Sequence, residues 1–237
     1  MTSAPTSVFT PAATVRGALA LIAGRDETAA VYRRFGTRIS SDGYTVGVFA
    51  GTEAAAAVSW LGEQPHGPRV LVGSDTGASA ALTALTQGDV ADAAIVAGVV
   101  VDAEHTPTDA ERTACPVHLG VLAEQHAASS AAAGSATSTT DDAARADLPD
   151  AADLAAISVP VLAVHGGSDP VSPFAQAQAV LSAIPDVETI ETVDGLHDAL
   201  NDQTHRSVAA SIVLWLERLR AGDVHAAIVR RPEDARA

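Results

Sequence analysis

Short apolar stretches recur along the chain, separated by longer segments in which apolar residues return at helical spacing. This alternation predicts an α/β fold, in which a parallel sheet carries helices on both faces. The predicted strands are Ala18 to Ala23, Tyr44 to Ala50, Arg69 to Gly73, Ala93 to Val101, Pro160 to His165 and Val187 to Val193. Together they give a mostly parallel sheet of about six strands.

Helix boundaries are marked by turn residues. The segment Glu27 to Ser41 lies between the first two strands, and Asp42-Gly43 is a turn after which a strand resumes. The last helix is expected over Ser207 to Arg220, where apolar residues repeat at helical spacing before Ala221-Gly222.

One long segment interrupts this alternation. We interpret residues 103–157 as a small cap insertion within a single domain that spans residues 1–237. The firmer part of the cap is expected over Thr113 to Gln125. By contrast, Ala127 to Asp147 holds almost no side chain large enough to pack, which predicts a flexible loop or a loosely ordered helix.

The composition narrows the function classes. At 237 residues, with 47% hydrophobic but only 3% aromatic residues, the chain can bury one core built mainly from small aliphatic side chains. Its formal net charge is −15, and all of its basic residues are Arg. An acidic surface repels phosphate backbones and anionic membranes, so neither nucleic acid nor a membrane is expected as a partner. The Ala-rich composition without Lys is typical of a GC-rich bacterial genome.

Cellular location is indicated by what the sequence lacks. Cys115 is the only cysteine, which excludes an intrachain disulfide and a Cys-based zinc site. The segment Met1 to Thr14 has no signal-peptide pattern, and no apolar run is long enough to span a membrane. We therefore expect a cytoplasmic protein.

The strongest chemical signal is the segment Arg69 to Leu82, which reads RVLVGSDTGASAAL. A strand is followed by Gly73 and Gly77 around a central Asp75, and then by an Ala-rich helix. This is the pattern of a nucleophile elbow, a sharp turn from strand to helix that needs glycine on both sides of the exposed central residue. Taken alone, the motif also fits an ordinary turn or part of a nucleotide site.

Two later residues follow predicted strands in the same way. Asp169 comes just past the strand that ends at His165, and His197 comes after the strand that ends at Val193. Asp75, Asp169 and His197 thus occur in the chain order of a nucleophile, acid and histidine triad. Two simpler alternatives are that Asp169 caps the following helix and that His197 and Asp198 form a surface turn pair.

With these residues the chain, from Arg16 to Arg220, resembles the α/β-hydrolases, and most closely their lysophospholipase and monoacylglycerol lipase group. That group carries a His-Gly-x-Gly-Glu segment followed by an aromatic residue. Here the corresponding residues are Ala23-Gly24-Arg25-Asp26-Glu27 and Tyr32, with Ala23 in place of the His and Asp26 in place of the second Gly. The resemblance implies that the backbone N–H groups of Arg25 and Thr76 form the oxyanion hole.

An aspartate at the elbow changes the expected chemistry. A carboxylate is a poor nucleophile for acyl transfer but readily displaces a leaving group from sp³ carbon, as similarity to haloalkane dehalogenases and epoxide hydrolases implies. The sequence departs from these enzymes because Thr76 replaces the Trp of dehalogenases and because the only tyrosines, Tyr32 and Tyr44, precede the cap. We expect a hydrolase of a small, uncharged molecule, with Asp75, Asp169 and His197 as its triad. The alternatives are a non-catalytic binding protein of the same fold and an interaction module.

No cofactor and no metal are expected. Cys115 and His118 are close in sequence, but the Pro between them favours a packed cap loop over a reactive pair. The remaining histidines outside the strand ends show no metal-ligand spacing; they include His105, His126, His205 and His225.

Overall fold

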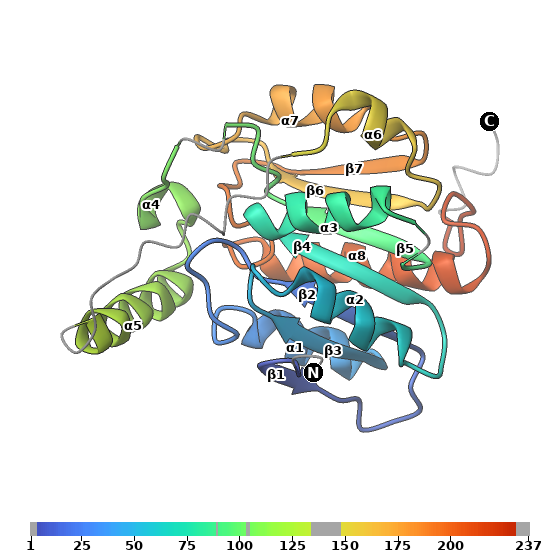
Figure 1. The fold of residues 1–237 in the computed structure, drawn as a ribbon, viewed down its shortest axis with the longest axis horizontal. Coiled ribbons are helices and arrows are strands. Elements are labelled where there is room, and N and C mark those ends of the chain that lie inside the picture. Colours follow the sequence, from blue (N-terminus) through green and yellow to red (C-terminus); the bar gives the residue numbers. More distant parts are fainter. Residues whose placement is uncertain (1–3, 89, 103–104, 134–147, 231–237) are drawn as a thin grey trace.

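The computed structural model describes residues 4–88, 90–102, 105–133 and 148–230 (Figure 1). Seven strands form one sheet in the order β1-β3-β2-β4-β5-β6-β7. Their bounds are β1 Ser7–Phe9, β2 Gly17–Ile22, β3 Tyr44–Phe49, β4 Arg69–Ser74, β5 Ala93–Ala97, β6 Val161–Gly166 and β7 Val187–Thr192. All neighbouring strands are parallel except β1, which pairs antiparallel with β3.

The strands β2 to β7 lie at the six predicted apolar stretches, and the expected mostly parallel sheet is confirmed. The sheet has one strand more than expected, because β1 has only three residues and its side chains are partly exposed, so that it carries no long apolar run. Strand β5 ends at Ala97 and not at Val101. The chain turns there because Gly98 has a φ of 54°, which lies outside the range of an extended strand.

Helices cover both faces of the sheet. Their bounds are α1 Arg33–Ser41, α2 Ala54–Gly62, α3 Thr76–Thr86, α4 Asp109–Arg112, α5 Pro116–Ala133, α6 Ala151–Ala155, α7 Phe174–Leu181 and α8 His205–Arg220. Side chains of α1 and α8 pack with Leu19 and Leu21 on one face, while those of α2 and α3 pack with Ala20 and Ile22 on the other. Successive residues of β2 therefore enter opposite cores, as expected for a parallel sheet buried on both faces.

The connection from β5 to β6 contains α4, α5 and α6, and Figure 1 shows α4 and α5 to one side of the sheet. Helix α4 begins with a capping box in which the Thr108 side chain accepts from the Glu111 N–H and the Glu111 side chain accepts from the Thr108 N–H. Helix α5 continues through residue 133, and the side chains of residues 127–131 are exposed. The rest of the stretch expected to be weakly ordered, residues 134–147, lies outside the described residues.

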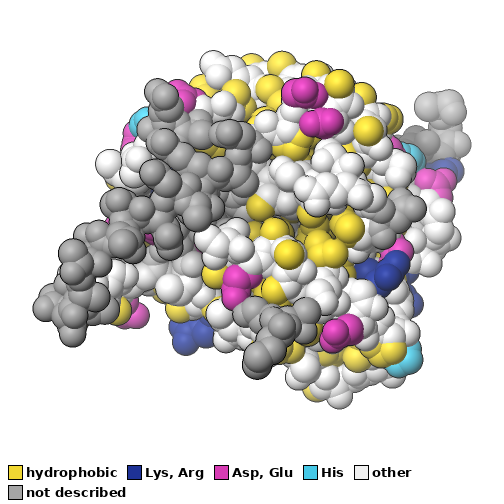
Figure 2. All heavy atoms as spheres, in the orientation of Figure 1, with side chains coloured by type: hydrophobic (Ala, Val, Ile, Leu, Met, Phe, Trp, Pro, Cys, Tyr) yellow, Lys and Arg dark blue, Asp and Glu magenta, His cyan; other side chains and the backbone are white. Residues whose placement is uncertain are grey.

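The surface reflects the acidic composition. Figure 2 shows acidic side chains scattered over one face, in line with the formal net charge of −15. Among the described helices, none combines the length and the apolar content that crossing a membrane requires.

Candidate active site

The turn between β4 and α3 holds Asp75 in a conformation that few residues adopt. Its φ is 51° and its ψ is −125°, a backbone strain that costs about 1–3 kcal/mol. A Cβ added to Gly73 would lie 2.2 Å from the carbonyl oxygen of Gly77, and one added to Gly77 would lie 2.3 Å from that of Ile22. Gly73 is therefore required by the close approach of the first turn of α3, and Gly77 by the packing of this turn against the end of β2.

Three side chains from separate strand ends meet at this turn. Asp169 follows β6 and His197 follows β7. The His197 ring lies between the two carboxylates, with Nδ1 2.8 Å from Asp169 Oδ2 and Nε2 3.1 Å from Asp75 Oδ1. All three residues are at least 95% buried, since none exposes more than 5% of its surface. The three residues singled out from the sequence thus form one hydrogen-bonded chain.

The simpler alternatives for Asp169 and His197 do not account for these positions. Asp169 Oδ1 accepts hydrogen bonds from the N–H groups of Val171 and Ser172, but no side chain caps α7. Its second oxygen contacts His197, so Asp169 stabilises the turn and orients the imidazole at once. A surface pair of His197 with Asp198 is wrong, because each exposes only 1% of its surface.

Arg25 contacts the Asp75 carboxylate with both its backbone and its side chain. Its backbone N–H, expected to be an oxyanion-hole donor, lies 2.8 Å from Asp75 Oδ2. Its guanidinium also binds the carboxylate: Nε lies 3.0 Å from Oδ1 and 2.9 Å from Oδ2, and Nη2 lies 2.8 Å from Oδ1. Thr76, the second expected donor, is the first residue of α3, so its N–H lies at the helix N-terminus. The side-chain contact of Arg25 was not anticipated from the sequence.

A buried network holds the loop that carries Arg25. The N–H of Gly24 donates to Glu27 Oε2 and to Tyr32 Oη, both at 3.0 Å, and the Tyr32 hydroxyl donates to Glu27. Asp26 has a φ of 57°, which lies in the left-handed region that favours glycine. A Cβ at Gly24 would lie 2.9 Å from the Cβ of Asp75. The loop is thus fixed close to the elbow.

Comparison with known proteins identifies the architecture. The sequence matches no protein-family model and no curated protein. Among solved structures, an esterase domain from Rhodothermus marinus covers 89% of this chain and 91% of its own, with a TM-score of 0.61 and 17% identity. A monoacylglycerol lipase from Paleococcus ferrophilus covers 89% of this chain and 96% of its own, with a TM-score of 0.58 and 17% identity. This chain has the α/β-hydrolase fold.

A serine hydrolase involved in carbazole degradation gives the same result. Its TM-score is 0.63 at 16% identity, with 88% of this chain and 93% of the other covered. The expected α/β-hydrolase fold is therefore confirmed. At such identities the likeness shows the fold alone.

Two positive groups, Arg25 and His197, and two negative groups, Asp75 and Asp169, balance one another in this site. Burial alone would raise the pKa of Asp75, but hydrogen bonds from His197 and Arg25 outweigh it and hold that pKa well below its usual range. The pKa of Asp169 is likewise lowered, against burial, by hydrogen bonds from His165 and His197. Burial would lower the pKa of His197, yet hydrogen bonds to Asp169 and Asp75 raise it to about 10. The resting site therefore holds an imidazolium between two carboxylates.

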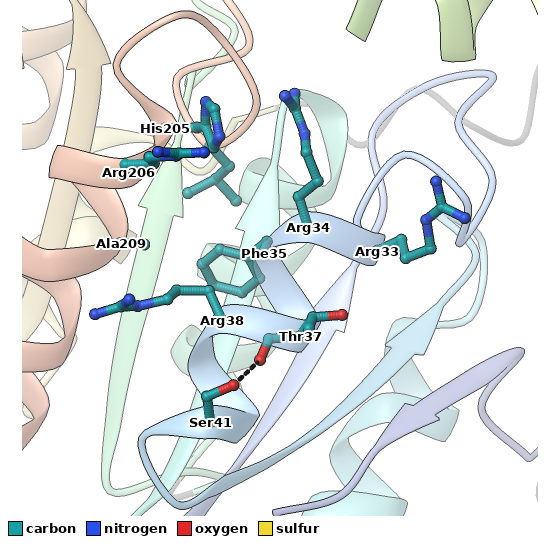
Figure 3. A pocket seen from close by; sticks show the side chains of 10 residues that line it. Arg33, Arg34, Phe35, Thr37, Arg38, Ser41, His205, Arg206 and Ala209 are labelled. Atoms are coloured by element: carbon teal, nitrogen blue, oxygen red, sulfur yellow. Dashed lines mark hydrogen bonds between the residues drawn. The ribbon is translucent and has the colours of Figure 1, made fainter. Parts of the chain in front are cut away.

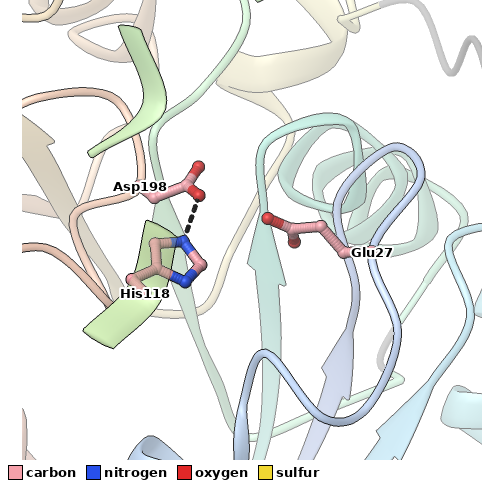
Figure 4. Close-up of side chains that lie close together, drawn as sticks. All are labelled: Glu27, His118 and Asp198. Atoms are coloured by element: carbon pink, nitrogen blue, oxygen red, sulfur yellow. Dashed lines mark hydrogen bonds and ion pairs between the residues drawn. The ribbon is translucent and has the colours of Figure 1, made fainter. Parts of the chain in front are cut away.

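A second buried cluster lies behind the Arg25 loop. Figure 4 shows the Glu27 side chain facing His118 and Asp198. Each of the three offers one atom that could ligate a metal ion, and these atoms lie within 4.8 Å of one another. His118 Nε2 is 2.7 Å from Asp198 Oδ2, and Arg112 Nη1 is 3.1 Å from Glu27 Oε1. A metal ion bound here would have to compete with the Arg112 guanidinium for the Glu27 carboxylate.

No local sequence pattern predicted this cluster. Its members come from the Arg25 loop, α4, α5 and the residue after His197, so they share no local spacing. Burial raises the pKa of Glu27 to about 8, with a further contribution from the nearby Asp198 carboxylate. The cluster joins α4 and α5 to the loops on which Arg25 and His197 lie.

Proposed function

We propose that this chain is a hydrolase that forms a covalent alkyl ester on Asp75 and cleaves it with water activated by His197. One observation carries the proposal. The Asp75 carboxylate accepts a hydrogen bond from His197 Nε2 on one oxygen, at 3.1 Å, and from the Arg25 N–H on the other, at 2.8 Å. These contacts supply a general base and an oxyanion donor on either side of a single carboxylate.

In the first step, Asp75 Oδ1 attacks an sp³ carbon of the substrate. The new C–O bond forms as the bond to the leaving group breaks, and the leaving group departs with the bonding electrons as an anion. The carboxylate is already ionised, since its pKa is held well below the usual range by His197 and Arg25 despite burial. No base is needed to activate it. The Arg25 guanidinium has to release Oδ1 for the attack.

In the second step, the charge change on Asp75 makes His197 a base. The ester is neutral, so His197 loses one of the two carboxylates that raise its pKa and releases its proton to solvent, where it balances the charge of the leaving-group anion. His197 then takes a proton from water as the hydroxide adds to the Asp75 carbonyl carbon. Negative charge develops on Oδ2, where the Arg25 N–H lies. Collapse of the intermediate returns this proton to the departing alkoxide and releases an alcohol, and the resulting Asp75 carboxylic acid gives its own proton to His197, which restores the carboxylate and the imidazolium.

The substrate class follows from the available acids. Departure of an alkoxide from an epoxide calls for a proton donor on the side opposite the attacking oxygen. His197 contacts the attacking Oδ1 itself, and Tyr32 donates to Glu27 and Tyr44 to Glu217. A leaving group that is stable as an anion, such as a halide, needs no such donor. We infer a small, uncharged alkyl substrate with a leaving group of this kind.

The segment 103–157 would act as the cap over this substrate. Two contacts tie it to the Arg25 loop: Arg112 donates to the Arg25 carbonyl at 3.2 Å, and the His105 carbonyl accepts from Arg25 Nη1 at 2.7 Å.

A non-catalytic binding protein of the same fold is the second candidate. It is favoured by the paired contacts of the Arg25 guanidinium with both oxygens of Asp75, because a carboxylate held in this way is a weaker nucleophile. In this case Asp75 neutralises Arg25 inside the site and attacks nothing.

Mass spectrometry of intact variants separates the two candidates. In His197→Ala, incubated with a panel of alkyl halides, epoxides, lactones and p-nitrophenyl esters, we expect a covalent adduct on Asp75, because alkylation proceeds while ester cleavage slows by about 10²–10⁴-fold. Asp75→Ala should form no adduct and show no turnover. His126→Ala removes a histidine that is 57% exposed and serves as the matched control. No adduct with any member of the panel, or turnover that survives Asp75→Ala, would exclude the proposed mechanism.

Asp75→Ser adds a contrast. Esterase activity that appears only in this variant would show that the oxyanion donors are functional and that the natural protein does not use them on esters.

A further inference from the structure

A pocket of about 600 Å³ lies between α1 and α8, away from the triad (Figure 3). It is lined by Arg33, Arg34, Phe35, Thr37, Arg38, Ser41, Leu200, His205, Arg206 and Ala209. None of these residues is acidic, although Asp and Glu number 29 in the chain and Lys and Arg only 14. Four arginines in one concave surface give a local positive field in an otherwise negative protein.

Most of this positive charge is not neutralised. Arg34 donates to the carbonyl of Asn201 at 2.6 Å and to Cys115 Sγ at 3.3 Å, neither of which is a carboxylate. Arg206 has no carboxylate within ion-pair distance in the described part of the chain, whereas Arg38 pairs with Asp42 at 3.3 Å. Guanidinium groups that face a cavity without acidic partners are suited to bind an anion there.

The arrangement of the side chains indicates the shape of the anion. Figure 3 shows Arg34, His205 and Arg206 near one end of the pocket, with Phe35 between them and Arg38. Arg33 points away from this group in the same view. The apolar wall is formed by Phe35, Leu200 and Ala209. The pocket thus has a cationic end and an apolar wall, and its volume is in the range of small-molecule sites.

We propose that this pocket binds a phosphate monoester of a small organic molecule. The phosphoryl group would lie between Arg34 and Arg206, and the organic part would lie along Phe35. A phosphoryl group offers three acceptor oxygens and nearly two negative charges, which matches two forked guanidinium groups better than a single carboxylate does. The site shares no residue with Asp75, Asp169 and His197. Arg34 connects it to the loop that follows His197, through the Asn201 carbonyl.

Isothermal titration calorimetry of the full chain with phenyl phosphate tests the proposal. We expect saturable binding that weakens about 10-fold or more in Arg206→Gln and in Arg34→Gln, because each loses a charge-assisted hydrogen bond. Arg230→Gln removes the same charge from an exposed position outside the pocket and should bind as the native chain does. Arg206 is exposed and holds no ion pair, so its variant remains informative if Arg34→Gln does not fold.

Three further ligands fix the chemical class. Inorganic phosphate, benzoate and phenol should each bind more weakly than phenyl phosphate. Inorganic phosphate lacks the organic part, benzoate lacks the second negative charge, and phenol has no anionic group. Equal binding of any one of them would overturn the corresponding part of the assignment. Absence of saturable phenyl phosphate binding, or equal weakening in Arg230→Gln, would overturn the site itself. None of these measurements depends on turnover at Asp75.

Discussion

Replacing Asp75 with Asn tests the charge coupling on which the second step of the proposed reaction depends. In the native chain, burial would lower the pKa of His197, but hydrogen bonds to Asp169 and Asp75 raise it to about 10. The substitution keeps the size of the side chain and removes one of the two negative charges. It therefore imitates the charge of the alkylated enzyme without requiring a substrate.

The size of the effect follows from the contact distance. A charge of opposite sign within about 4–6 Å changes a pKa by about 1–3, and Asp75 Oδ1 lies 3.1 Å from His197 Nε2. We expect His197 of Asp75→Asn to titrate between about 7 and 9. Arg25 acts in the same direction, because its guanidinium would then lie beside the imidazole without its carboxylate partner. Each unit by which the pKa falls corresponds to a loss of about 1.4 kcal/mol in the free energy that stabilises the imidazolium relative to neutral imidazole.

Nuclear magnetic resonance of histidine-labelled protein measures this pKa directly. The chain has 8 histidines, and the signal of His197 is assigned by its loss in His197→Gln. Asp109→Asn is a suitable control, because that carboxylate pairs with the exposed His126 and should leave His197 unchanged. A His197 that still titrates near pH 10 in Asp75→Asn would refute the reasoning, because alkylation of Asp75 would then not release a base.

Two further predictions concern stability. Gly77→Ala should lower the midpoint of thermal unfolding, because the added Cβ would lie 2.3 Å from the carbonyl oxygen of Ile22; overpacking costs about 1–3 kcal/mol, and each kcal/mol lowers the midpoint by about 2–4 °C in a chain of this size. Gly62→Ala, where a Cβ meets no atom within 4 Å, is its control, and equal midpoints in the two variants would contradict the expected crowding at the elbow. The second prediction concerns Glu27, whose pKa burial raises from 4.5 to about 8, so its contribution to stability is complete below about pH 4.5 and is lost as the pH rises through about 8. As the pH rises from 5 to 9, the free energy of unfolding of the native chain should therefore fall relative to that of Glu27→Gln, as measured by urea unfolding at each pH. A difference between the two proteins that does not vary with pH would disprove the raised pKa of Glu27.

The sequence by itself determined the elements that arise from local pattern. Apolar runs located β2 to β6, because strands buried on both faces need apolar residues in succession. The glycines around Asp75 predicted a sharp turn, because close backbone packing excludes a side chain at those positions. The positions of Asp169 and His197 just after strands predicted that both residues lie near Asp75, because parallel strands bring their carboxyl ends to one edge of the sheet.

Only the tertiary structure decided which charges meet. Arg25 and Asp75 are 50 residues apart, and Glu27 and Arg112 are 85 apart, so no periodicity relates the members of either pair. The short, partly exposed β1 escaped prediction because it buries too little apolar surface to leave a pattern. The Arg25 side chain points into the site because burial of Asp75 makes an unpaired carboxylate costly, and a nearby guanidinium removes that cost. Local sequence determines the strand, helix or turn on which each charged residue lies, but packing between distant segments determines which residue becomes the partner of a buried charge.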